Sequence, residues 1–227
     1  MKKRILILFS IISFTLTGYG QTTYWNTAHY ANWDFGSGGN AGRVPYAQLP
    51  WKYITNMILF AGGTGGNQTN GTSPYYNVPG NLNDATTDSI IKWGRMYGVH
   101  IELDLGLGSG YNSLWNAGDA ALQVWAHTVA NIIVARGYDG YDFDLEGMSG
   151  PPTTSGHAHN MCYDMMKYLH DTLTARVPGK KFYSTCDILD AAGNVGIFHL
   201  GYAVADGYLD QVSPMWYDQC FPQPSPL

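Results

Sequence analysis

The stretch YDGYDFDLEG, residues 138–147, constrains the fold of this chain more than any other. Asp142, Asp144 and Glu146 alternate there with large apolar or aromatic residues, so on a β-strand the acids point to one side and the apolar residues to the other. Helices must cover the apolar side, which aims the acids at the inside of a sheet or barrel. The whole chain holds only 17 Asp and Glu residues, so their crowding on one strand indicates a functional site.

Carboxylates this close cannot all stay ionised without a large electrostatic repulsion. Two negative charges about 5 Å apart repel by roughly 3 kcal/mol at an effective dielectric near 20, which corresponds to about two pK units. We therefore expect at least one of the three acids to keep its proton at neutral pH, as acid catalysis of bond cleavage requires. Glu146 stands nearest the carboxyl end of the strand, where barrel enzymes bind their substrates.

A calcium loop is the main alternative for these acids, because the spacing of Asp142, Asp144, Glu146 and Gly147 matches the start of one. That loop needs a Glu at its twelfth position, which here is Thr153, and its ligands are usually separated by polar residues. The apolar residues between these acids suit a strand better. We expect neither a metal nor another cofactor.

Segments of strand and helix character alternate along the rest of the chain, which predicts parallel β/α units. The expected strands are residues 23–33, 54–61, 99–105, 138–146, 181–186 and 209–217, and the expected helices are 84–97, 117–136 and 160–177. In the first helix we expect Ile90, Ile91, Trp93 and Met96 to share a buried face, and in the second Val124 is among the core candidates.

The N-terminus predicts export. Positive residues 2–4, an apolar stretch over 5–16 and a small-residue site at Gly18 and Gly20 are typical of a signal peptide spanning 1–20, with an uncleaved anchor as the alternative. The domain would then be 21–227, secreted to the extracellular space or the periplasm. Cys162, Cys186 and Cys220 lack zinc-site spacing, and export would permit one disulfide whose pair the sequence cannot choose.

Composition narrows the class of partner. Only 13% of residues are charged and the net charge is −5, which argues against nucleic acid or, after signal cleavage, a membrane as partner. Aromatic residues make up 14% of the chain, which suits stacking on sugar rings, although any single aromatic residue is more often part of a core.

The acidic motif, with Asp139 and Gly140 before it, resembles the DGxDxDxE signature of the glycoside hydrolase family 18 chitinases. Tyr30-Ala31-Asn32-Trp33 looks like the end of that family's first barrel strand, 54–61 looks like its second, and Met215-Trp216-Tyr217-Asp218 matches the MxYD motif of its sixth. The resemblance runs over nearly all of the mature chain. It implies a (β/α)8 TIM barrel that cleaves β-1,4-linked N-acetylglucosamine polymers with retention, the substrate's acetamide acting as nucleophile.

The resemblance also implies a role for individual residues. Glu146 would be the acid and base, Asp144 would orient the acetamide, Asp142 would share a proton with Asp144, and Tyr217 would bond the acetamide oxygen. The expected substrate-binding residues are Met215, Asp218, Tyr30 and Trp33. Asp139 would be structural, at the entrance of the strand.

Two departures from the family pattern stand out. The third strand often carries SxGG where this chain has Asp104-Leu105-Gly106-Leu107, and the first often has Tyr where this chain has His29. We hypothesise that His29 and Asp104 form an alternative polar support near Asp142. The chain also stops just after the sixth strand, so we expect an incomplete barrel of about six β/α units, a fragment of a longer enzyme, with a shorter open α/β protein as the alternative.

Three functions remain open from the sequence. The favoured one is a chitinase that, if complete, acts as a monomer on a polysaccharide or oligosaccharide. The second is an endo-β-N-acetylglucosaminidase acting on N-glycan cores, which uses the same acidic motif. The third is a non-catalytic carbohydrate-binding protein of the same fold, although such proteins typically lack the terminal acid and Glu146 is present here.

Overall fold

The computed structural model of the protein describes residues 25–31, 45–60, 84–105, 118–145, 161–188 and 197–214. In chain order the elements within them are β1 (Thr27–Ala31), the 3-10 helices η1 (Tyr46–Gln48) and η2 (Trp51–Tyr53), β2 (Asn56–Phe60), α1 (Asp84–Tyr97), β3 (His100–Asp104), α3 (Asp119–Arg136), β4 (Gly140–Leu145), α4 (Met161–Arg176), β5 (Tyr183–Ile188), α5 (Ile197–Ala205) and β6 (Gln211–Pro214).

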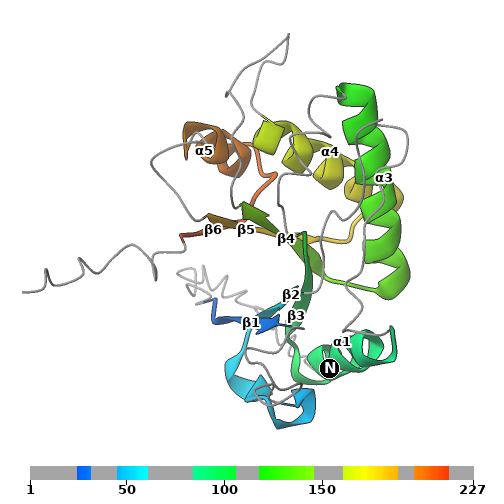
Figure 1. Ribbon diagram of the computed structural model, residues 1–227, viewed down its shortest axis with the longest axis vertical. Coiled ribbons are helices and arrows are strands. Elements are labelled where there is room, and N and C mark those ends of the chain that lie inside the picture. The colour runs from blue at the N-terminus through cyan, green and yellow to red at the C-terminus, as the bar shows by residue number, and fades with distance from the viewer. Residues whose placement is uncertain are drawn as a thin grey trace, which may run out of the picture.

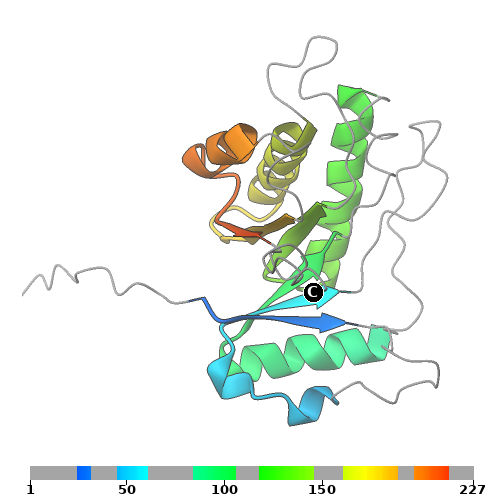
Figure 2. The ribbon, with the colours of Figure 1, turned by 60° about the vertical axis from the view of Figure 1, so that its left-hand side comes forward.

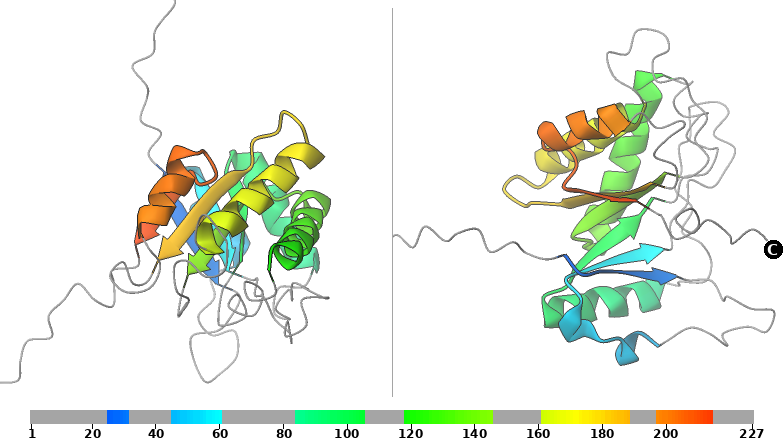
Figure 3. Two further views of the ribbon diagram at one scale, coloured as in Figure 1. Left: turned by 90° about the horizontal axis from the view of Figure 1, so that it is seen from above. Right: turned by 90° about the vertical axis from the view of Figure 1, so that its left-hand side faces the viewer.

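The strands form one sheet in the order β1-β2-β3-β4-β5-β6, and every neighbouring pair is parallel. The helices lie on its outer side, with α1 against the β1–β3 half and α3, α4 and α5 against the β4–β6 half (Figures 1 and 2). Figure 3 shows the same arrangement from above and from the side. Each crossover therefore returns the chain to the next parallel strand, as the alternation of elements in the sequence predicted.

The sheet curls strongly, as in a barrel. The imidazole Nε2 of His29 on β1 lies 2.5 Å from a carboxyl oxygen of Asp187 on β5. Neighbouring strands are about 4.8 Å apart, so four steps across a flat sheet would separate these strands by roughly 19 Å. The contact is possible only across a concave inner face. The predicted fold class is confirmed: six parallel β/α strands form an incomplete (β/α) barrel.

A repeated pair of hydrogen bonds fixes the register of alternate strands. The residue just before β2, β4 and β6 donates its backbone N–H to a carbonyl at the start of the preceding strand, and its side chain accepts the N–H of that same residue. The three pairs are Thr55 with Asn26, Asp139 with Ile101 and Asp210 with Ser184. The structural role predicted for Asp139 is thereby confirmed.

The predicted helices are confirmed to within two residues at each end. Helix α3 ends where Gly137 adopts a left-handed conformation (φ 80°) and donates its N–H to the carbonyl of Ile133. Two predicted core residues are wrong: the side chains of Met96 and Val124 are exposed. In α1 the buried stripe contains Ile90 and Ile91, and at 100° per residue Met96 lies well outside it.

Helix α5 and the two 3-10 helices were not predicted. Trp51 in η2 is buried, donates its indole N–H to the carbonyl of Tyr46, and stacks on Tyr97 of α1. Helix α5 buries Leu200 and Ala203. Among the helices in the described ranges, none combines the length and apolarity that a membrane crossing demands.

Gly140, the first residue of β4, is required by close packing. A Cβ at this position would lie 2.2 Å from the backbone carbonyl oxygen of Tyr183 on β5, a contact that the sheet cannot relieve without moving a strand. We predict that Gly140→Ala lowers the free energy of unfolding by about 1–3 kcal/mol or more, measured by urea denaturation. The matched control is Gly201→Ala in α5, where a Cβ meets nothing within 4 Å and should stabilise by up to about 1 kcal/mol. Equal midpoints for Gly140→Ala and wild type would contradict the predicted strain.

Candidate active site

Strand β4 divides its side chains between two faces, as predicted. Tyr141 and Phe143 are buried on the outer face, where the Phe143 ring lies 6.3 Å from the Trp125 ring of α3. Asp142 and Asp144 point to the inner face and are only 0% and 6% exposed. Helices on the outer side therefore hold both carboxyl groups inside the curled sheet.

The neighbouring strands add further acids to the same face. The register places Asp104 of β3 opposite Asp142, and Asp187 of β5 opposite Asp144. Glu102, two residues before Asp104 on β3, points inward as well. The inner face thus carries five buried carboxyl groups: Glu102, Asp104, Asp142, Asp144 and Asp187.

A hydroxyl group links two of these acids and shows where a proton lies. Thr185 Oγ1 is 2.5 Å from an oxygen of Asp142 and 2.9 Å from an oxygen of Glu102. A hydroxyl has one proton, so this arrangement is best satisfied when one of the two carboxyl groups is protonated and donates to Thr185. Glu102 already accepts a hydrogen bond from Asn56 at 2.6 Å, which suits a carboxylate. The proton therefore belongs on Asp142.

The electrostatics of the site agree with this assignment. Burial, followed by the charge of Asp187 and then those of Glu102 and Asp144, raises the pKa of Asp142 well above its usual value. Burial also raises the pKa of Glu102 to about 7, against the hydrogen bonds from Asn56 and Thr185, which lower it. The raised pKa favours the protonated form of Asp142, and Glu102 is close to its midpoint near neutral pH.

His29 is the basic side chain of this cluster. Burial lowers its pKa, but the hydrogen bond and charge of Asp187, and then the charges of Asp144 and Glu102, outweigh burial and raise the pKa above 6.5. In the predicted polar support near Asp142, His29 bonds Asp187, which lies on the neighbouring strand β5. Asp104 does lie beside Asp142, as the register requires.

Aromatic side chains line the inner face at the opposite, amino-terminal end of the strands. The rings of His100 on β3 and Tyr183 on β5 have centroids 4.0 Å apart, and Trp25 meets Tyr183 edge-on at 5.5 Å. They lie at the strand starts, one layer below Glu102 and Thr185. A substrate would therefore have to approach the acids from the carboxyl ends of the strands.

The other predicted site residues have varied outcomes. Glu146, Tyr217, Met215, Asp218 and Trp33 lie outside the described residues, so their roles stay predictions. Tyr30 is 7% exposed and belongs to the hydrophobic core, on the opposite face of β1 from His29. That position does not favour the sugar contact predicted for Tyr30.

Sequence reasoning missed Glu102, Thr185 and Asp187. A signal was present for each, because HIELD on β3 and STCDI on β5 alternate polar and apolar residues as β4 does. Buried acids are rare, however, so the sequence alone favours exposed positions for the acids of these short strands. Only the curl of the sheet brings these side chains together.

The described cysteines are free thiols. Cys162 and Cys186 are both buried and unpaired, and burial raises the pKa of Cys162 to about 12. Cys220 lies outside the described residues. Both described thiols therefore act as small core residues.

No protein-family model and no curated protein sequence matches this chain. Solved structures do. It superposes on catalytic domain 2 of the Group II chitinase of Ostrinia furnacalis with a TM-score of 0.63, at 17% identity, covering 85% of this chain and 50% of that one. A family GH18 chitinase of Chromobacterium violaceum gives 0.57 at 18% identity, covering 85% and 50%, and a chitinase of Bacteroides thetaiotaomicron gives 0.57 at 17%, covering 88% and 56%.

The fold resembles that of the family 18 chitinases. At these identities the likeness concerns the fold, and the chain spans about half the length of the structures that it matches. The resemblance inferred from the acidic motif is confirmed at that level.

The raised pKa of Glu102 predicts a pH dependence of stability. Its folded-state pKa is about 7 against 4.5 for the free group, so the folded state binds more protons between these values and stability falls as pH rises through that window. Glu102→Gln should remove a loss of about 3 kcal/mol between pH 4 and pH 8, measured as the change in free energy of unfolding. Asp88→Asn on the exposed face of α1 is the control and should leave the wild-type slope. An unchanged slope in Glu102→Gln would show that Glu102 ionises normally.

The His29–Asp187 pair predicts a coupling that depends on pH. Because the pKa of His29 is raised, its contribution is fully present below pH 6.5 and is lost as pH rises past the raised value. A double-mutant cycle with His29→Gln and Asp187→Asn should give about 1 kcal/mol at pH 5.5, modest because the imidazole side is 42% exposed, and less at pH 9. The Lys167–Asp171 pair of α4 is the control, with equal coupling at both pH values. A coupling equal at both pH values for His29 and Asp187 would mean that His29 is not charged.

Proposed function

We propose that this chain is the acid-bearing part of a glycoside hydrolase that cleaves β-1,4-linked N-acetylglucosamine polymers with retention. The observation that carries the proposal is the buried carboxyl group of Asp142, hydrogen-bonded to Thr185 inside a barrel of chitinase fold, two residues before Asp144 and four before Glu146 in the sequence. Solved relatives of this fold are chitinases, which supports a glycoside hydrolase or chitin-binding role.

In the proposed mechanism Glu146 protonates the leaving glycosidic oxygen and later activates water as a base. The acetamide of the substrate closes on the anomeric carbon in place of an enzyme nucleophile, which is the substrate-assisted exception to the two-carboxylate scheme. Asp144 orients the acetamide nitrogen and stabilises the positive charge that develops there. Asp142 shares its proton with Asp144, so that Asp144 can turn toward the substrate without leaving two bare charges side by side.

The geometry of the inner face supports this division of labour. Thr185, itself bonded to Glu102, holds one oxygen of Asp142, whereas the second oxygen of Asp142 has no hydrogen-bond partner among the described residues. Asp187 uses one oxygen for His29, and its other oxygen is likewise without a partner in that part of the chain. Each acid is thus fixed by one oxygen and leaves the other for exchange of a proton or contact with substrate.

Chitin-like substrates are favoured over other sugars. One structure of the Ostrinia furnacalis domain, with a TM-score of 0.64, is a complex with the N-acetylchitooligosaccharide (NAG)5. The MxYD match at Met215 to Asp218 leans the same way. We also propose that residues 1–20 are removed on export and that the mature protein acts outside the cytoplasm.

Hydrolysis assays decide between this function and its rivals. The chain, supplied with soluble chitooligosaccharides and with a high-mannose glycopeptide, should release product from the first, and Glu146→Gln and Asp144→Asn should each lower kcat by about 10²- to 10⁴-fold. Asp142→Asn should lower kcat less and displace the pH profile. Asp171→Asn on the surface of α4 is the matched control and should retain full activity.

Each remaining outcome identifies an alternative. Release from the glycopeptide alone would identify an endo-β-N-acetylglucosaminidase. Binding of chitooligosaccharides without turnover, unaltered by Glu146→Gln, would identify a carbohydrate-binding protein. Full activity in Glu146→Gln would contradict the proposed role of Glu146 as acid and base.

A further inference from the structure

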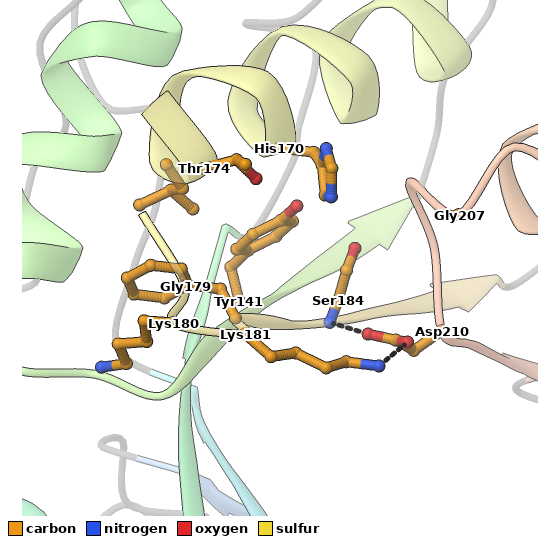
Figure 4. A pocket seen from close by; sticks show the side chains of 11 residues that line it. Tyr141, His170, Thr174, Gly179, Lys180, Lys181, Ser184, Gly207 and Asp210 are labelled. Carbon is orange, nitrogen blue, oxygen red and sulfur yellow. Dashed lines mark hydrogen bonds and ion pairs between the residues drawn. The ribbon is translucent and has the colours of Figure 1, made fainter. Parts of the chain in front are cut away.

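A cavity lies on the outer side of the sheet, opposite the face that carries the acids. It has a volume of about 380 Å³ and opens between α4, the starts of β4 and β5, and the turn before β6. Figure 4 shows Tyr141 and Ser184 pointing from the sheet toward His170 and Thr174 of α4. Because side chains alternate along a strand, these residues face away from Asp142 and Thr185.

Two buried hydroxyl groups point into this cavity without a well-oriented hydrogen bond. Tyr141 is 0% exposed and Ser184 is 2% exposed, and their hydroxyls lie near enough for Ser184 to act against the burial that raises the pKa of Tyr141. Neither hydroxyl makes a well-aligned hydrogen bond among the described residues, and a pair of hydroxyls can use only one of its two protons internally. A buried hydroxyl left unsatisfied costs about 1–3 kcal/mol. Phenylalanine and alanine would fill these positions without that cost, so the hydroxyls require an explanation.

The charges around the cavity are already neutralised. Lys181 Nζ lies 2.6 Å from a carboxyl oxygen of Asp210, whose other oxygen accepts the backbone N–H of Ser184 (Figure 4). Lys180 Nζ lies 3.9 Å from a carboxyl oxygen of Asp139, donates to the carbonyl of Tyr138 and lies over the Phe182 ring. The lining therefore holds no uncompensated lysine that would select an anion.

The remaining walls are mixed in character. Leu173 and Phe182 supply apolar surface, whereas His170 and Thr174 supply an imidazole and a third hydroxyl. Hydroxyl and imidazole groups both donate and accept hydrogen bonds, and apolar surface packs against the C–H groups of a ring. The volume lies at the small end of ligand pockets.

We propose that this cavity binds a neutral, hydroxyl-rich ligand of the size of one sugar ring, with Tyr141 and Ser184 as its fixed hydrogen-bonding groups. The ligand supplies the well-aligned partners that the two hydroxyls do not supply to each other. This site is separate from the inner face, and its existence does not depend on the proposed hydrolase activity.

Saturation-transfer NMR on the full chain tests the proposal, with glucose, N-acetylglucosamine and inorganic phosphate as probes. We expect a saturable signal for a monosaccharide and none for phosphate. Tyr141→Phe and Ser184→Ala should each weaken monosaccharide binding about fivefold, the effect of one hydrogen bond, while the melting temperature stays equal or rises. Asp142→Asn should leave this binding unchanged, which separates it from sugar bound at the acids.

Control variants guard against indirect effects. Tyr53→Phe and Ser89→Ala, which remove hydroxyls at partly or largely exposed positions elsewhere, should not alter binding. His170→Ala removes a half-exposed wall of the cavity and tests the site even if a buried variant fails to fold. Absence of a monosaccharide signal, preference for phosphate, equal binding in Tyr141→Phe, Ser184→Ala and His170→Ala, or a lowered melting temperature in both hydroxyl variants would each overturn the proposal.

Discussion

The burial of five carboxyl groups inside one curled sheet governs the rest of this structure. Each of them is at most 6% exposed, and His29 is the basic group that meets them. Charges in such a space cannot be compensated by solvent, so they must be compensated by protons, by hydrogen bonds or by the imidazole. The chain Asp142–Thr185–Glu102–Asn56 supplies hydrogen bonds, and because it contains a single hydroxyl it favours a proton on one of the two acids. The geometry therefore favours a protonated carboxyl group, whatever substrate the barrel accepts.

The register of the strands decides which residues share that space. A slip by one residue would turn Asp142 and Asp144 into the outer core and bring Tyr141 and Phe143 inside, at a cost no fold of this size tolerates. The reciprocal hydrogen bonds before β2, β4 and β6 act against such a slip, because each ties a strand start to the strand before it through both backbone and side chain. Gly140 adds a steric condition, since only a residue without Cβ fits against Tyr183. Residues remote from the acids therefore position them.

The features that could be predicted from the sequence are those set by local periodicity. Alternation on β4 and helical spacing in α1, α3 and α4 depend on neighbours within a few residues, and the predicted elements agree with the observed ones. The prediction that Met96 is buried was wrong because Met96 lies outside the helical stripe that contains Ile91. Helix α5 was not predicted because its nine residues include no charged side chain and so show little alternation of polar and apolar positions. The His29–Asp187 contact could not be predicted, because it joins residues 158 positions apart and exists only once the sheet has curled. The acidic motif predicted the contribution of β4 to the site, whereas the contributions of β1, β3 and β5 depend on the register and curl of the sheet.

Alternation places two polar sites back to back on the same pair of strands. On β4, Tyr141 faces outward between inward-facing residues, and on β5, Ser184 faces outward next to Thr185. The polar groups on the two sides of the sheet differ in how they are hydrogen-bonded. Inside, Asp187, Glu102 and Asp142 are hydrogen-bonded by His29, Asn56 and Thr185, and the second oxygens of Asp142 and Asp187 suit proton exchange. Outside, the hydroxyls face an open, charge-balanced cavity that a hydrogen-bonding ligand would complete. Because the strands are shared, a change of register would destroy both sites together, whereas single substitutions can separate them.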